Sequence, residues 1–272
     1  ERGTRLKGQN ADGSGAAARR PAGLRASAVS PLAIGDSFTI DSQVLGEVRP
    51  VNVFVPTTYG QKFDAPMPVL CALDGGTNED YLHVVGLVQV LVSNGGMRPY
   101  IVVGIPNTQR RRDLTGPTDN LDDKKMAPVV GGSATFRRFI REELIPTIRA
   151  RYRTTDEAAI VGESLAGYFV LETLVQEPDL FDAYVAVDPS LWWNDKALLS
   201  AAERMVSNGA AGRERVFIAS STAPTSSATC ERFTRAVQTR GAGRVNCEHV
   251  PFETEPHQTI YQPALLRAFR TV

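Results

Sequence analysis

Short apolar segments separated by amphipathic helical patterns constrain the fold of this chain more than any other feature. The apolar segments lack the alternation of a half-exposed strand, which is typical of strands covered by helices on both faces. They lie at residues 68–73, 100–105, 158–161, 183–187, 215–220 and 245–250. Strands that alternate with helices favour a mostly parallel sheet with right-handed crossover connections.

Helical patterns separate these segments, and two alternating strands precede them. Phe38 and Ile40, and then Val51 and Val53, alternate with their neighbours and predict an antiparallel pair. Helices are predicted near residues 80–93, 134–151, 165–176, 196–207, 230–239 and 263–269. The sequence therefore predicts one α/β domain over residues 36–272, with about eight strands in a single sheet and helices on both faces.

The first 35 residues differ from the rest of the chain. They are rich in Ala, Gly and Arg and contain no aromatic residue. Such a segment buries too little apolar surface to offset the entropy lost on ordering. We therefore expect a disordered basic tail at residues 1–35, with a basic binding arm as the alternative.

The composition excludes several functional classes. Lys and Arg together number 30, as do Asp and Glu, so the formal net charge is zero and no nucleic-acid partner is expected. No apolar run approaches the roughly 18 residues of a membrane span, and we expect a soluble protein, either exported or cytoplasmic. The three cysteines form no zinc-type pair, so we expect no metal and no cofactor. A disulfide between Cys230 and Cys247 stays open, as does the oligomeric state.

The sequence GESLAG at residues 162–167 is the most informative motif. It follows an apolar strand and opens a helix, like the Gly-x-Ser-x-Gly elbow that exposes a serine at a sharp strand-to-helix turn. Gly162 and Ala166 are the small residues that this turn requires, although Ala166 replaces the usual Gly. Ser164 is therefore a candidate nucleophile, and the alternative is a serine that caps a helix.

A serine hydroxyl needs a base, and in α/β-hydrolases the chain order is Ser, acid, His. His257 follows the last predicted strand, where this order requires the base. His249 lies inside that strand, and His83 precedes the serine. The sequence thus offers one histidine, His257, at the place that the mechanism requires.

Further segments extend the match beyond the elbow. They are PVLCALDG at 68–75, VGIPNT at 103–108 with Arg110, Arg112 and Asp113 after it, REELIP at 141–146, PDLFDAY at 178–184 and PSLWW at 189–193. Because they occur in the family's order and spacing, the chain resembles the esterase D-like family of α/β-hydrolases over residues 42–269. Within that family it resembles the bacterial enterochelin or siderophore-esterase-like branch.

This resemblance implies an α/β-hydrolase fold with Ser164 as nucleophile and His257 as base. It also implies an oxyanion hole formed by the backbone N–H groups of Gly76 and Leu165. Such donors face the oxygen that becomes negative in the tetrahedral intermediate. A siderophore lactone is the substrate that the family suggests.

Glu163 departs from the family pattern, because this branch usually has a His beside the nucleophile. A carboxylate at this position could disfavour an anionic substrate or hold a nearby arginine.

The acid of the triad is the second departure. The family's acid usually follows the strand at 215–220, but residues 221–229 contain no Asp or Glu. Asp188 ends the neighbouring strand, and our hypothesis is that it orients His257. Two alternatives stay open: Glu231 as the acid, or a Ser164–His257 dyad without one.

Two tryptophans and a basic run are candidates for binding substrate. Adjacent aromatic residues cannot point the same way, so one of Trp192 and Trp193 could face the core and the other the active-site cleft, with Trp192 as the candidate for binding substrate. The alternative is that both simply pack in the protein. Arg110 and Arg112 could pair with carboxylate or phenolate groups of a substrate. The alternative is a solvated loop in which Arg112 helps to fix local structure, and residues 119–125 are also expected to form a solvated loop.

Together these features predict a serine carboxylic-ester hydrolase that acts on a small-molecule ester through an acyl-enzyme on Ser164. Two other functions stay open. One is an acyltransferase of the same family, and the other is a non-catalytic binding protein on a hydrolase scaffold.

Overall fold

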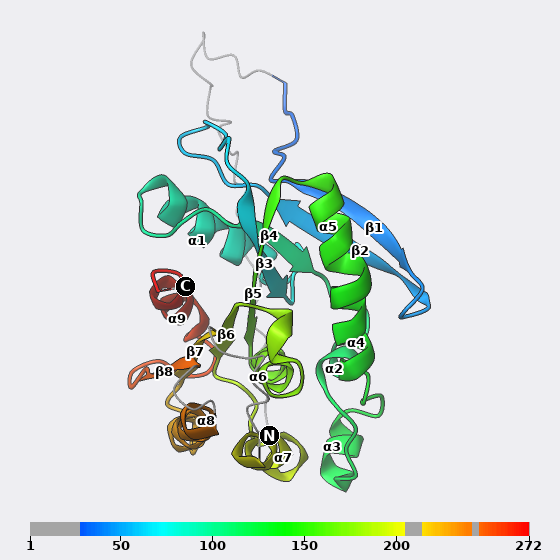
Figure 1. Cartoon of the computed structure of the whole chain (residues 1–272), viewed down its shortest axis with the longest axis vertical. Helices are drawn as coiled ribbons and strands as arrows, with labels where there is room; N and C mark the ends of the chain where they lie inside the picture. Colours follow the sequence, from blue (N-terminus) through cyan, green and yellow to red (C-terminus); the bar gives the residue numbers. More distant parts are fainter. Residues whose placement is uncertain (1–27, 205–213, 241–244, 272) are drawn as a thin grey trace, which may run out of the picture. The chain divides into compact units, whose positions relative to one another are not determined.

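The strands form one eight-stranded sheet in the order β1-β2-β4-β3-β5-β6-β7-β8 (Figure 1). The computed structural model describes residues 28–204, 214–240 and 245–271. The strands are β1 (Asp36–Ser42), β2 (Glu47–Phe54), β3 (Met67–Leu73), β4 (Ile101–Ile105), β5 (Thr154–Glu163), β6 (Ala183–Val187), β7 (Arg215–Ser220) and β8 (Asn246–Pro251). Strand β2 pairs antiparallel with β1 and β4, and all other pairs are parallel. The predicted hairpin and mostly parallel sheet are both present.

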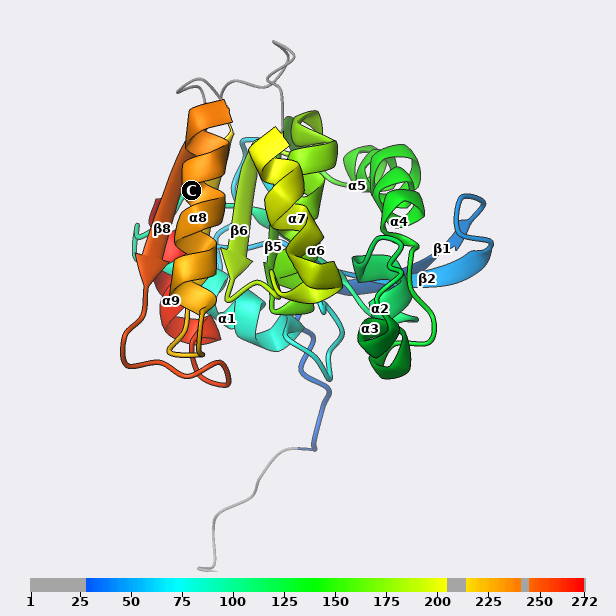
Figure 2. The same ribbon diagram turned by 90° about the horizontal axis from the view of Figure 1, so that it is seen from below.

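Helices cover both faces of the sheet (Figure 2). They are α1 (Tyr81–Ser93), α2 (Arg110–Leu114), α3 (Leu121–Met126), α4 (Ser133–Phe139), α5 (Ile145–Arg151), α6 (Leu165–Gln176), α7 (Trp193–Arg204), α8 (Ser226–Arg240) and α9 (Tyr261–Ala268). The sheet has an apolar core on each face, and successive side chains of β3 point into different ones. Cys71 belongs to the core formed with α4 to α8, and Ala72 belongs to the core formed with α1 and α9. This explains why the central strands are apolar throughout.

Two sequence predictions are wrong in the segment between β4 and α4. The residues expected as solvated loops form the short helices α2 and α3. Asn120 caps α3 by accepting hydrogen bonds from the N–H groups of Asp122 and Asp123, at 2.8 and 3.1 Å. Asp123 is buried and accepts a hydrogen bond from the N–H of Asn194 at 2.8 Å. A charged, short helix carries no apolar periodicity, so its sequence reads as a loop.

The predicted helix at 134–151 is present but contains a π-helical turn at Ile140–Leu144. Pro146 follows this turn and has no N–H to donate to the preceding turn of helix. Cys71, Cys230 and Cys247 are buried free thiols, so Cys230 and Cys247 form no disulfide. Among residues 28–204, 214–240 and 245–271, no helix combines the length and the apolar character needed to cross a membrane.

The predicted tail at residues 1–35 falls largely outside the described residues, which begin at residue 28. Residues 28–35 belong to no helix or strand. Residues 34–272 form a compact unit by themselves, and this unit contains every site residue predicted from the sequence.

Candidate active site

Ser164 lies on a strained turn between β5 and α6. Its backbone has φ 57° and ψ −117°, a conformation that is unfavourable for a residue other than glycine. Backbone strain of this kind is often found at functional turns. Its N–H donates to the carbonyl oxygen of Val187 at 2.9 Å, which ties the turn to β6. A Cβ atom on Gly162 would lie 2.7 Å from Ala166, so the turn requires glycine there. The geometry is that of the nucleophile elbow predicted from the sequence.

A cavity of about 320 Å³ opens beside this turn, at the carboxyl ends of the parallel strands. Its lining residues come from the turn after β5, the loops after β6, β7 and β8 and the first turn of α8; they are Ser164, Asp188, Pro189, Ser190, Leu191, Trp192, Ala223, Pro224, Thr225, Ser226, Thr229 and His257. The hydroxyl oxygens of Ser164 and Ser190 are 3.3 Å apart. The cavity thus brings the predicted nucleophile, base and acid together.

Asp188 and His257 form a close pair at one side of the cavity. The Nδ1 atom of His257 lies 2.5 Å from Oδ2 of Asp188. Because an ionised carboxylate only accepts hydrogen bonds, Nδ1 carries the proton and Nε2 is left free to act as a base. Asp188 has φ 41°, so the chain turns sharply where β6 ends.

Two serines complete the surroundings of Asp188. The N–H and hydroxyl of Ser221 donate to its carboxylate at 3.0 and 2.7 Å, and the hydroxyl of Ser226 also donates. Burial by itself raises the pKa of Asp188, but the hydrogen bonds outweigh burial and lower this pKa to about 2. The hydrogen bond to Asp188 raises the pKa of His257. The sequence analysis did not identify these serines, although Ser221 directly follows β7 at the edge where the site lies.

Glu231, the alternative acid, lies elsewhere. It is exposed on α8 and pairs with Arg235, four residues along the same helix, at 2.7 Å. Among the carboxylates of the described residues, the one that contacts His257 is therefore that of Asp188. This pairing depends on β6 and the loop after β8, which lie far apart in the sequence.

The two N–H groups proposed for an oxyanion hole differ in their surroundings. Leu165 is the first residue of α6, and a helix leaves the N–H groups of its first turn without intrahelical acceptors. The N–H of Gly76 donates to Oε2 of Glu79 at 2.7 Å. Glu79 would therefore have to release this N–H before Gly76 could bind an oxyanion.

The two tryptophans point in different directions, as expected for neighbours in the sequence. Trp193 is 1% exposed and belongs to the core, whereas Trp192 is 51% exposed and lines the cavity. Their rings meet edge to face, with centroids 6.0 Å apart. Trp192 thus forms an apolar wall beside Ser164.

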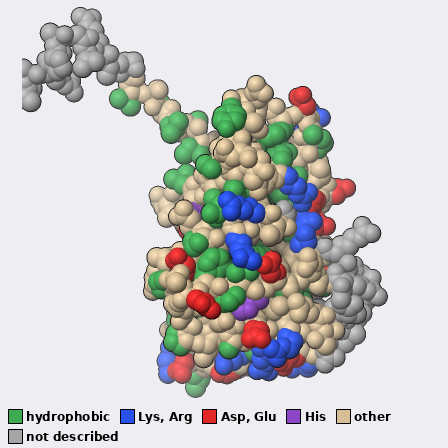
Figure 3. Space-filling model, turned by 90° about the vertical axis from the view of Figure 1, so that its left-hand side faces the viewer, with side chains coloured by type: hydrophobic (Ala, Val, Ile, Leu, Met, Phe, Trp, Pro, Cys, Tyr) green, Lys and Arg blue, Asp and Glu red, His purple; other side chains and the backbone are tan. Residues whose placement is uncertain are grey.

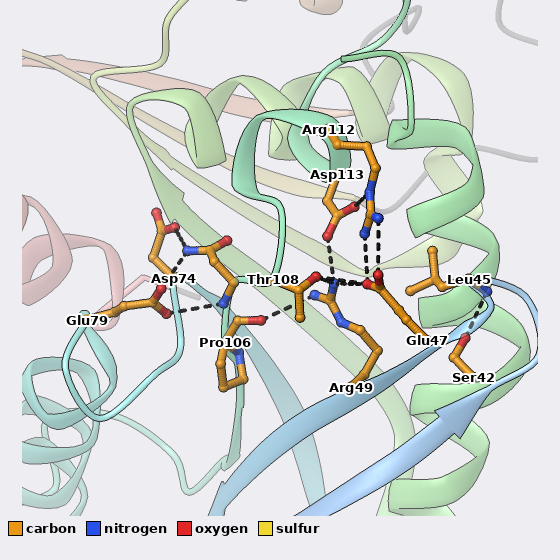
Figure 4. Close-up of polar contacts among 11 residues, drawn as sticks. Ser42, Leu45, Glu47, Arg49, Asp74, Glu79, Pro106, Thr108, Arg112 and Asp113 are labelled. Carbon is orange, nitrogen blue, oxygen red and sulfur yellow. Dashed lines mark hydrogen bonds and ion pairs between the residues drawn. The ribbon is translucent and has the colours of Figure 1, made fainter. Parts of the chain in front are cut away.

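The predicted substrate-binding arginines are both paired with carboxylates of the protein. Arg110 binds Asp74 through two hydrogen bonds of 2.6 and 2.7 Å. Arg112 binds Glu47 at 2.7 Å and Asp113 at 2.6 Å (Figure 4). Neither arginine lines the cavity. The placement of Arg112 agrees with the alternative in which it fixes local structure.

The described residues hold no group of three or more His, Cys, Asp or Glu side chains placed to bind a metal ion. On the face drawn in Figure 3, acidic and basic side chains are interspersed and form no continuous patch of one sign.

The model of the family described as "Putative esterase" matches residues 42–240 of this chain. The ferri-bacillibactin esterase BesA of Bacillus subtilis is 32% identical over 59% of this chain and 61% of its own length. The siderophore triacetylfusarinine C esterase of Aspergillus fumigatus is 38% identical over 65% of this chain and 62% of its own length. The chain therefore covers less than two thirds of these relatives.

Solved structures also match this fold. An IroE-like serine hydrolase from Shewanella oneidensis has a TM-score of 0.77 and 28% identity, over 87% of this chain and 79% of its own. The BES protein from Bacillus cereus has a TM-score of 0.78 and 22% identity, over 91% and 98% of the two chains. The second likeness concerns the fold alone. The sheet of this chain is thus that of an α/β-hydrolase.

Proposed function

The chain belongs to the esterase family whose model it matches over residues 42–240, and from this premise we propose that it is a serine carboxylic-ester hydrolase. One observation carries the proposal. A serine on a strained elbow shares a cavity with a histidine whose Nδ1 is held by a buried carboxylate. This arrangement activates a hydroxyl that is otherwise a weak nucleophile.

In the proposed reaction, Oγ of Ser164 attacks the carbonyl carbon of the ester while Nε2 of His257 takes its proton. Asp188 keeps the imidazole in the required tautomer and stabilises the imidazolium that forms. The Ser164 hydroxyl now faces Ser190, so it has to rotate toward His257 when substrate binds. The N–H of Leu165 would stabilise the oxyanion, joined by that of Gly76 once Glu79 moves.

The tetrahedral intermediate then collapses, and the bond between the carbonyl carbon and the alcohol oxygen breaks. His257 returns its proton to the departing alcohol, which leaves an acyl group on Ser164. Water, deprotonated by the same histidine, attacks the acyl carbon. The bond from this carbon to Oγ of Ser164 then breaks, Oγ regains its proton from His257, and the acid is released. No atom outside the ester, water and the protein is needed.

The substrate that we propose is a small-molecule ester whose acyl group fits the cavity of about 320 Å³ against Trp192. The relatives named for siderophore esterases support an ester of that class. Most of the cavity lining comes from the turn after β5 and the loops after β6, β7 and β8, where ligands of open α/β sheets commonly bind.

The test is hydrolysis of p-nitrophenyl esters from acetate to laurate by the wild type and by Ser164→Ala. We expect activity that falls at least about 10⁴-fold in the variant. Ser190→Ala is the matched control, because it removes the other hydroxyl of the 3.3 Å contact; we expect it to lower the rate by no more than about tenfold.

Folded wild-type protein that hydrolyses none of the esters and does not react with a fluorophosphonate would contradict the proposal and favour a binding scaffold. An added alcohol that captures most of the acyl group would indicate an acyltransferase instead.

A further inference from the structure

Glu163 occupies an unusual place for a carboxylate, directly before Ser164 at the end of β5. It lies beside Val187 of β6 in the strand register. Val161, two residues earlier, belongs to the core beneath α1 and α9. Since side chains two residues apart share a face of a strand, Glu163 lies on the face of this core, at the carboxyl end of β5 and next to Ser164, although it does not itself line the cavity.

Negative groups dominate the surroundings of Glu163. The titratable groups that interact electrostatically with it come from the β3–α1 connection, β6, the loop after β8 and α9; they are Asp74, Asp80, Asp188, His257 and Tyr261. Arg110 of α2 acts on two of these neighbours, Asp80 and His257. Arg110 is occupied by the two hydrogen bonds to Asp74. Among the described residues, Glu163 itself has no hydrogen-bond or ion-pair partner on its carboxylate.

The ionisation of these carboxylates falls within an accessible pH range. Burial, and then the nearby charges of Asp80, Asp188 and Asp74, raise the pKa of Glu163 to about 7, although His257 opposes this effect. Burial and Asp74 raise the pKa of Asp80 to about 6. At pH 8 the carboxylate of Glu163 is therefore mostly charged.

The cavity itself offers no compensating positive charge. Among the described residues, its lining includes no Lys and no Arg, and its titratable side chains are Asp188 and His257. A negative group bound there would lie beside the carboxylate of Asp188, and Glu163 directly precedes Ser164 in the chain. In a medium less polarisable than water, such like charges repel strongly. An uncharged group would meet Trp192, Leu191 and the serine and threonine hydroxyls instead.

We propose that Glu163 is a specificity-determining residue that makes the site prefer esters with an uncharged acyl group over esters with an anionic one. The inference rests on the proposed esterase function and narrows its substrate class. Among siderophore esters, it selects those whose acyl group is uncharged.

The test compares two esters of nearly equal size, methyl p-nitrophenyl adipate and the anionic mono-p-nitrophenyl adipate. At pH 8 we expect the wild type to favour the neutral ester by about tenfold or more in kcat/KM. Glu163→Gln should reduce this ratio at least about threefold. Glu253→Gln removes the same charge from an exposed position on the loop after β8 and should leave the ratio unchanged.

A second measurement needs no variant. Between pH 6 and pH 8.5 the adipate carboxyl stays ionised while Glu163 and Asp80 become charged, so the preference of the wild type for the neutral ester should rise with pH. If Glu163→Gln does not fold, a preference of the wild type that stays constant across this range overturns the role of Glu163.

The outcomes separate the two proposals. Hydrolysis that depends on Ser164 but proceeds equally well on both adipates, at every pH, overturns the role of Glu163 and leaves the esterase function standing. A folded wild type that hydrolyses neither adipate and none of the p-nitrophenyl esters from acetate to laurate overturns the esterase function and this inference with it.

Discussion

Two regions of the molecule each hold a buried carboxylate in a short ion pair, and of these two carboxylates only Asp188 lines the cavity beside Ser164. Asp188 pairs with His257 beside Ser164. Asp113 pairs with Arg49 at 2.7 Å, between β2 and α2 (Figure 4). Arg49 is 1% exposed and also binds Glu47, and its guanidinium lies over the rings of two phenylalanines.

The difference lies in access and in the chemistry of the cation. An arginine stays protonated, so the Arg49 network can position a backbone but cannot transfer a proton. The ion pair between Arg49 and Asp113 links β2 to α2, the helix from which Arg110 binds Asp74. His257 gains or loses its proton near neutral pH and is open to the cavity. A strong polar network therefore marks a reactive site only when a group that titrates also meets an accessible nucleophile.

The largest effect that tests this comparison is expected at Asp188. Asp188→Asn removes the acceptor that fixes the tautomer of His257 and should lower kcat about 10⁴-fold while the protein stays folded. Glu231→Gln is the matched control and should change kcat by less than about twofold. A large loss for Glu231→Gln with a small one for Asp188→Asn would reverse the assignment, and small losses for both would favour a Ser164–His257 dyad.

The counterpart in the other region is Asp113→Asn. Because it leaves the buried charge of Arg49 short of a partner, it should lower the free energy of unfolding by about 3 kcal/mol, measured by urea denaturation. The kcat of the folded protein should fall by less than about threefold. Asp122→Asn, which breaks an exposed pair with Lys125, should cost less than about 1 kcal/mol. A loss of kcat without a loss of stability for Asp113→Asn would contradict the view that the Arg49 network stabilises the fold and takes no part in catalysis.

The two tryptophans differ in the same way, because Trp192 is exposed to the cavity and Trp193 is buried in the core. Trp192→Ala should lower kcat/KM for long-chain or aryl esters about tenfold and spare acetate, because an apolar wall of the cavity is lost. Trp193→Ala should instead cost about 3 kcal/mol or more of stability. Equal effects of Trp192→Ala on acetate and laurate would argue against its role as a wall for the acyl group.

The smallest effect concerns the pH profile. The hydrogen bond to Asp188 raises the pKa of His257 above its usual 6.5, and Glu163 contributes in the same direction. Since catalysis needs neutral imidazole, the acid limb of kcat/KM should lie above pH 6.5 in the wild type. In Glu163→Gln the limb should move toward lower pH, seen as a higher ratio of activity at pH 6 to activity at pH 8 on a neutral ester. A limb that moves upward would contradict the coupling.

Much of the fold could be predicted because it is encoded locally. The central strands and most helices show their periodicity over a few turns or residues, and the elbow at Ser164 is a contiguous motif with its own steric requirement. Helices α2 and α3 could not be predicted in this way, because capping by Asn120 and the burial of Asp123 against Asn194 stabilise residues with no apolar pattern.

The sequence by itself determined the order of the elements, the serine on its turn and the late position of His257. Only the tertiary structure decided which carboxylate meets His257, since the sequence favoured Asp188 but left Glu231 open, and the two differ in where their elements lie. It likewise decided which tryptophan faces the cavity and that Arg112 binds Glu47. These outcomes depend on contacts between segments far apart in sequence, and such contacts exist only once the sheet has brought its strand ends together.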